Sequence, residues 1–135
     1  MKLDHDCIRD VLISVERLQR FEYRTGTGNF LNYSVTRNIL ENDIQNRNAE
    51  DICYSVLMLA DAGYIIASIN QTDQRVVSYS VHRMTYDGHE YLESIRDGNV
   101  WNKVKSVIGD VGISTFDAVK KTAINLLLSK LQDIL

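Results

Sequence analysis

Apolar positions recur along the chain at two different spacings, which predict helices in some stretches and strands in others. From Asp4 onward they return every three or four residues, the spacing of a helix that buries one face. The residues of this face are Leu3, Cys7, Ile8, Val11, Leu12, Val15 and Leu18. Asp4 is the expected N-cap, and Arg17, Arg20 and Arg24 form a basic cluster at and beyond the far end of this helix. We predict a first helix here.

The next stretch is less regular. Thr25–Asn29 reads as a loop, because the third glycine of a dinucleotide-binding motif is missing after Gly26 and Gly28 and no P-loop lysine follows. Phe30–Tyr33 is predicted as a short strand that pairs with a later hairpin. Ser34–Arg47 is predicted as a weaker helix. Its expected core residues are Val35, Ile39, Leu40 and Ile44.

The clearest pattern runs from Asn48 to Met84. Asn48 caps a helix that Gly63 ends, and two β-rich runs, Tyr64–Ile69 and Arg75–Met84, follow. Positions 70–74 are polar and form the expected tip of the hairpin. The predicted inward residues of the helix are Ile52, Cys53, Val56, Leu59 and Ala60, and those of the strands are Ile65, Ala67, Ile69, Val77, Tyr79 and Val81. A capped helix followed by a hairpin is the second half of a winged helix-turn-helix.

Helices are predicted for the remainder of the chain. Thr85 should cap one helix, Asn99 a second, and Ser114 or Thr115 a last one after a linker at 109–112. The predicted fold is therefore α+β, a winged helix-turn-helix over residues 1–97 with a C-terminal helical extension over residues 98–135.

The last helix carries an apolar stripe that is too wide for an isolated surface helix. We expect it to form a homodimer interface, and docking within the monomer is the alternative. The expected interface residues are Phe116, Ala123, Leu127, Leu131 and Ile134. Three lysines, at 120, 121 and 130, are too few for a helix that binds a membrane surface.

Composition says more about where the protein is expected to be located than about what it does. The chain has 135 residues and a formal net charge of −3, without an apolar run near the roughly 18 residues of a membrane span. The N-terminus lacks the basic and then apolar build of a signal peptide, so a cytoplasmic location is expected. Cys7 and Cys53 fall on apolar helix positions, as reduced core thiols do.

Three stretches together resemble a known family. They are Met1–Arg9, Leu59–Ile65, and Met84–Asp97 with Val100 and Trp101. In this order they are similar to short proteins common in bacterial phages and prophages, described as a domain of unknown function. The part from Gly88 to Trp101 is the most specific. The resemblance implies a winged-helix fold and a mobile-element setting, and it implies no activity.

Catalytic chemistry is not predicted. The three histidines, His5, His82 and His89, do not stand at metal-ligand spacing with the cysteines. Neighbouring residues on a helix point to different sides, so His5 and Cys7 do not make a nucleophile and base pair. We expect no enzyme activity, no metal and no cofactor.

The outward face of the third helix indicates the kind of partner. It presents Glu50, Tyr54, Met58 and Asp61, an aromatic anchor and a thioether between acidic residues. No lysine or arginine occurs from residue 48 to residue 74, which disfavours contact with phosphates. We predict a non-enzymatic module that binds a protein of basic character, such as a host factor; an anti-CRISPR inhibitor is one form it could take. The alternative is a dimeric DNA-binding transcriptional regulator.

Overall fold

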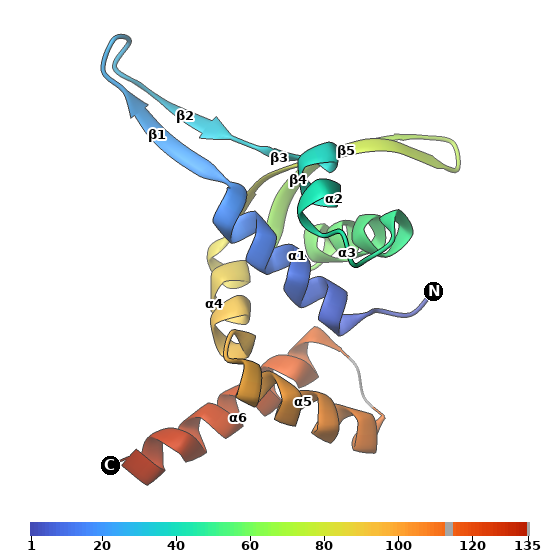
Figure 1. The fold of residues 1–135 in the computed structure, drawn as a ribbon, viewed down its shortest axis with the longest axis vertical. Helices are drawn as coiled ribbons and strands as arrows, with labels where there is room; N and C mark the ends of the chain where they lie inside the picture. The colour runs from blue at the N-terminus through green and yellow to red at the C-terminus, as the bar shows by residue number, and fades with distance from the viewer. Residues whose placement is uncertain (113–114, 135) are drawn as a thin grey trace. The chain divides into compact units, whose positions relative to one another are not determined.

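The computed structural model describes residues 1–112 and 115–134 and is an α+β structure (Figure 1). Its described residues form six helices and two small antiparallel sheets. The elements are, in order, α1 His5–Leu18, β1 Arg20–Arg24, β2 Asn29–Tyr33, β3 Val35–Thr36, α2 Arg37–Asp43, α3 Ala49–Asp61, β4 Ile65–Thr72, β5 Arg75–Met84, α4 Tyr86–Ile95, α5 Gly98–Val111 and α6 Phe116–Ile134. The chain forms two compact units, Met1–His89 and Glu90–Leu135.

A three-stranded sheet and three helices make the core of the first unit. The strands lie in the order β3-β5-β4, and all neighbours are antiparallel. Helices α1 and α2 contact β5, and α3 contacts β4, so the helices cover one face of the sheet. The largest buried side chains of this core include Ile8, Leu12, Leu40, Ile52, Leu59 and Ile65.

The predicted N-caps of α1 and α3 and the predicted glycine stop of α3 are confirmed. The Asp4 carboxylate accepts a hydrogen bond from the Cys7 backbone N–H at 3.1 Å, and the Asn48 side chain accepts one from the Asp51 N–H at 2.8 Å. After α3, Gly63 adopts a φ of 77°, and the Tyr64 N–H donates to the Leu59 carbonyl at 2.9 Å. This left-handed stop favours glycine, because a side chain is strained there.

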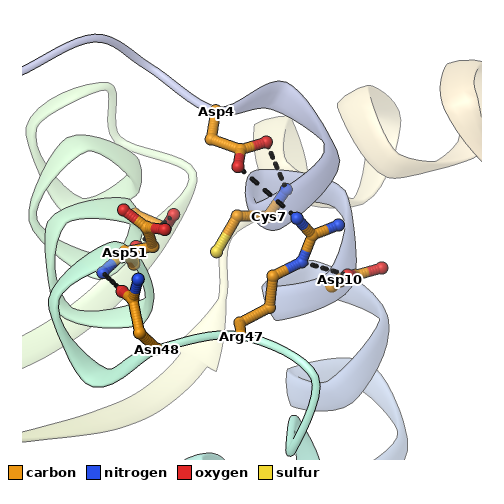
Figure 2. A network of polar contacts seen from close by, with 7 residues as sticks. Asp4, Cys7, Asp10, Arg47, Asn48 and Asp51 are labelled. Carbon is orange, nitrogen blue, oxygen red and sulfur yellow. Dashed lines mark hydrogen bonds and ion pairs between the residues drawn. The ribbon is translucent and has the colours of Figure 1, made fainter.

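Arg47 fixes the loop between α2 and α3 onto α1 (Figure 2). Its Nε donates to Asp10 at 3.1 Å and its Nη1 to Asp4 at 3.4 Å. The Arg47 side chain is 25% exposed. Burial lowers the pKa of its guanidinium, but the two aspartates raise this pKa by more, so the net shift is upward. Arg47 therefore holds the starts of α1 and α3 together.

Two predictions on the second helix are corrected. The helix covers only Arg37–Asp43, and Val35 is buried in strand β3 instead. Ile39, expected in the core, is 45% exposed, whereas Leu40 and Ile44 are buried as predicted. A short helix has only one side against the core, so fewer of its apolar residues can be buried.

The hairpin β4–β5 departs from simple alternation. Its strands run closer to the tip than predicted, so that only Asp73 and Gln74 form the turn. Register shifts between Ile66 and Ala67 and between Asn70 and Gln71 leave one extra residue on β5 at each place. Val77 is one of these, and it is exposed rather than inward-facing because a bulge interrupts the two-residue period.

Strand β2 pairs with β1 and not with the later hairpin. Tyr23 stands opposite Phe30, and Arg20 opposite Tyr33, in a two-stranded sheet of its own. We call Arg20–Tyr33 the arm; it reaches away from the helices of the first unit (Figure 1). The signal that predicts it is the alternation in Phe21-Glu22-Tyr23 before the glycine-containing turn.

Helices make up the second unit, which takes the last part of α4 and all of α5 and α6. Asp97, not Asn99, caps α5, and its carboxylate accepts from the Asn99 and Val100 N–H groups. Helix α5 continues through most of the predicted linker and ends at Val111, with Gly112 as its C-cap. Thr115 caps α6 by accepting from the Ala118 N–H, while Ser114 lies outside the described residues. None of the described helices is long and apolar enough to cross a membrane.

Candidate functional site

A shallow groove of about 530 Å³ lies between α3 and the tip of the β4–β5 hairpin. Its lining combines apolar side chains with a few charged and polar ones. The lining residues are Met1, Arg37, Ala49, Glu50, Cys53, Tyr54, Leu57, Gln74 and Val76. A concave, largely apolar surface with a small number of polar groups is typical of a site that receives side chains of a partner.

Two of the four predicted partner-binding residues line this groove. Glu50 is exposed at its edge, and Tyr54 is half-buried. Met58 and Asp61 lie further along α3 and are not among the lining residues; Met58 is half-buried and Asp61 exposed. The predicted set therefore forms a stripe along α3 of which the groove takes only the first half.

Arg37 lines the groove and makes two hydrogen bonds within the chain. Its Nε donates to Glu41 at 2.8 Å, and its Nη1 donates to the Val77 carbonyl at 3.1 Å. The hydrogen bond to Glu41 raises the pKa of the Arg37 guanidinium above its ordinary value. Arg37 therefore links α2 to the bulge of β5 beside the groove.

Sequence reasoning missed the far wall of the groove. Gln74 and Val76 come from the hairpin tip, and Arg37 from α2, and none of them is near α3 in the sequence. Cys53 was expected in the core, yet it is half-buried and lines the groove. Burial raises the pKa of the Cys53 thiol, so it contributes a neutral, apolar surface.

Cys7 is placed away from any reactive environment. Its side chain is fully buried, and the Ser55 side chain of α3 interacts with its thiol. Burial raises the pKa of the Cys7 thiol, which disfavours the thiolate that nucleophilic chemistry needs. Within the described residues, no three histidine, cysteine or acidic side chains gather as a metal site would require.

The arm exposes a cluster of aromatic rings. The register places Phe21, Tyr23 and Phe30 on one side of the two-stranded sheet. The Phe21 and Phe30 rings are stacked, with centroids 5.7 Å apart, and Tyr23 lies 5.2 Å from Phe30. These three side chains are 69%, 57% and 63% exposed in sequence order. Large exposed apolar clusters of this kind mark interaction sites.

His82 joins the arm to the sheet. It is the extra residue of a β5 bulge, and its two ring nitrogens hydrogen-bond to the Ser34 and Ser68 hydroxyls at 2.7 and 2.6 Å. The Asn32 side chain donates to the His82 carbonyl at 2.8 Å. His82 thus links the end of the arm to strands β4 and β5, a role that the sequence pattern did not indicate.

The predicted interface residues on α6 fall into two groups. Ala123 is fully buried, and Phe116 packs edge-on against Tyr91 with ring centroids 5.4 Å apart. Leu127 is half-buried, whereas Leu131 and Ile134 are 51% and 74% exposed. Ile124 and Leu128 are exposed beside them. Association through α6 stays a prediction. The exposed apolar residues near the end of the helix are the ones available for it.

Comparison with known proteins places the chain in a family. A family model described as "Hypothetical protein (DUF2513)" matches residues 2–114. A relative from Haemophilus influenzae, named "Uncharacterized protein", is 26% identical over 124 residues, which cover 91% of this chain and 92% of the relative. No solved structure matches. Since the match spans most of the sequence, the chain belongs to the DUF2513 family.

Proposed function

We propose that this chain is a non-enzymatic binding module of the cytoplasm, built on a winged helix, that engages a basic protein partner through the groove beside α3. The order α1, β3, α2, α3, β4, β5 with the sheet order β3-β5-β4 supports the winged-helix assignment. In this view the arm is an insertion between α1 and β3, and β4–β5 is the wing. A winged helix binds DNA in some proteins and protein in others, so the residues on its surface determine which kind of partner it binds.

The groove is the observation that carries the proposal. Tyr54, Leu57 and Val76 are among its lining residues and offer a contact surface for an apolar side chain of a partner. Glu50 at the rim adds a carboxylate for a lysine or arginine beside that side chain. Tyr54 is suited to anchor such a contact, because a tyrosine ring covers a large area with few rotatable bonds.

Charge on α3 favours this partner over DNA. Glu50, Asp51 and Asp61 are its only charged residues, which makes the helix negative from its first turn to its last. A DNA-reading helix would have to bring these carboxylates next to phosphates, against the interaction that dominates affinity. The alternative, a dimeric transcriptional regulator, would therefore have to use another face.

The resemblance to phage and prophage proteins suggests what the partner does. A mobile element gains from a small module that occupies a host protein. We therefore extend the proposal to a host factor, of which a component of host defence, bound as an anti-CRISPR protein binds its target, is one case.

The test compares two tyrosines of the same chain. Proteins captured by the full-length chain from bacterial lysate are identified, purified and titrated calorimetrically with the wild type, Tyr54→Ala, Glu50→Lys and the control Tyr86→Ala. Tyr86 is 76% exposed on α4 and does not line the groove, which makes it a matched control. Loss of a central aromatic anchor should weaken binding about 30-fold or more. Thermal unfolding of each variant confirms that the fold is kept.

Two outcomes would overturn the proposal. One is a purified partner that binds Tyr54→Ala and Glu50→Lys as tightly as the wild type. The other is tight, salt-sensitive binding of mixed-sequence duplex DNA in a mobility-shift assay at low salt, lost when α3 is altered.

A further inference from the structure

We propose that the arm and the open face of the three-stranded sheet bind single-stranded nucleic acid, at a site distinct from the groove beside α3 although Arg37 borders both. The bases would stack on the arm's exposed rings, and the backbone would follow the open face of the sheet.

Charge is distributed unequally between the strands and the helices of the first unit. The five strands carry four arginines, at 20, 24, 75 and 83, against one glutamate, Glu22. Helix α3 on the other side of the sheet carries three carboxylates and no basic residue. The chain's net charge of −3 therefore hides a strand surface that is positive and suited to phosphates.

The open face of the sheet is polar and hollowed. Paired residues that face away from the helices are Thr36, Ile66, Ser68, Asn70, Ser78, Ser80 and Arg83, and none of these described side chains is acidic. A hollow of about 520 Å³ lies beside them, bordered by Arg37 and Asn38. Hydroxyl and amide groups of this kind donate hydrogen bonds to phosphate and sugar oxygens without reading sequence.

Hydrogen bonds connect this face to the arm. Asn32 at the end of β2 donates to the His82 carbonyl, and the His82 ring is bonded to Ser68, which lines the hollow. The rings of the arm and the polar hollow are therefore parts of one linked surface, and not two isolated features.

The arm itself has the composition of a base-stacking platform. Three exposed rings, Phe21, Tyr23 and Phe30, lie on one side of its sheet, and Arg20 and Arg24 on the other. The Arg20 side chain is 73% exposed. Because the arm is a single two-stranded sheet, its long arginine side chains can reach a nucleic-acid strand that passes along either edge of that sheet. Aromatic stacking with nearby arginine is how proteins hold unpaired bases irrespective of sequence.

The size of the cluster argues against a second copy of this chain as its occupant. Rings of about 200 Å² each, exposed to the fractions given above, offer roughly 400 Å² together. A stable dimer buries about 800 Å² on each partner. Duplex DNA is also a poor match, because its bases are already stacked and cannot reach the rings.

Fluorescence anisotropy with a labelled oligothymidylate of about 15 nucleotides tests the proposal on the full-length chain. The wild type should bind at low salt, and more tightly than it binds a duplex of mixed sequence. Phe21→Ala with Phe30→Ala should weaken binding about 30-fold or more, since two bases would each lose the ring on which they stack. In the double variant Arg20→Ala with Arg24→Ala, the slope of the logarithm of the binding constant against the logarithm of the salt concentration should become less steep by about 1.4. Tyr54→Ala, which alters the groove and not the arm, is the control and should bind the oligothymidylate with the affinity of the wild type.

A fluorescence readout covers the case in which the double variant folds poorly. In Phe21→Trp the new indole stands on the exposed arm, whereas Trp101 is 4% exposed and supplies a constant background. Bound oligothymidylate should quench the new signal. The proposal is overturned by absent binding at low salt, by equal affinity for duplex, by full affinity without the rings, or by rings that prove necessary for dimerisation or protein capture instead.

Discussion

Gly88 provides the sharpest test of the packing, because α4 approaches the backbone of Tyr64 at this residue. A Cβ atom at position 88 would stand 2.0 Å from the Tyr64 carbonyl oxygen and 2.7 Å from Cγ of Met84. The obstacle is backbone, so it cannot rotate away. Relief requires α4 to move, which would break the bonds from the Thr85 N–H to the Tyr64 carbonyl, 3.0 Å, and from the Thr85 hydroxyl to the Gly63 carbonyl, 2.6 Å.

These losses set the expected size of the effect. Overpacking costs about 1–3 kcal/mol and each lost hydrogen bond about 1 kcal/mol, while alanine recovers up to about 1 kcal/mol of helix propensity. Gly88→Ala should therefore lower the free energy of unfolding by about 2–4 kcal/mol, or the melting temperature of a chain of 135 residues by roughly 7–14 °C.

Urea and thermal unfolding of Gly88→Ala and Gly98→Ala measure this directly. Gly98 is also at the start of a helix, but a Cβ there meets nothing within 4 Å, so its replacement should leave stability unchanged or slightly raised. Equal stability of Gly88→Ala and the wild type would refute the close approach of α4 to Tyr64.

Two further predictions concern an acidic side chain and the last helix. The Asp43 carboxylate accepts hydrogen bonds from Arg17 and Ser14, and these bonds lower its pKa. Its contribution to the free energy of unfolding is therefore complete above the ordinary pKa of 3.8 and is lost as the pH falls through the lower pKa of the folded state. Asp43→Asn should reduce the free energy of unfolding by about 1–2 kcal/mol at pH 7 and by less at pH 3; a urea series showing the same difference at both would contradict this. Light scattering should find a dimer that Leu128→Glu with Leu131→Glu separates and Lys130→Glu does not, and a monomeric wild type would refute association through α6.

Local signals in the sequence were sufficient for much of the fold. The caps at Asp4, Asn48 and Thr85 and the stop at Gly63 depend on residues three or four positions apart, so a single stretch contains the whole signal. The hairpin of β4 and β5 is local in the same way. The α+β class followed from these elements.

Features that depend on distant residues were not predictable in this way. The pairing of β2 with β1 competes with a plausible pairing to β5, and only the three-dimensional arrangement decides between them. The bulges at Val77 and His82 leave no mark in an alternating pattern. Two of the nine lining residues of the candidate site, Glu50 and Tyr54, were predicted because they belong to a stripe on one helix. The residues from α2 and the hairpin tip were missed because they are distant from that helix in the sequence.

Photo-crosslinking at the groove tests the central proposal most directly. A benzoylphenylalanine is placed at position 54 of the full-length chain, or at position 86 as the control, and irradiated in living bacteria. We predict a crosslink to a protein from position 54 and not from position 86. Crosslinks to nucleic acid alone, or an equal yield from both positions, would contradict a protein-binding groove beside α3.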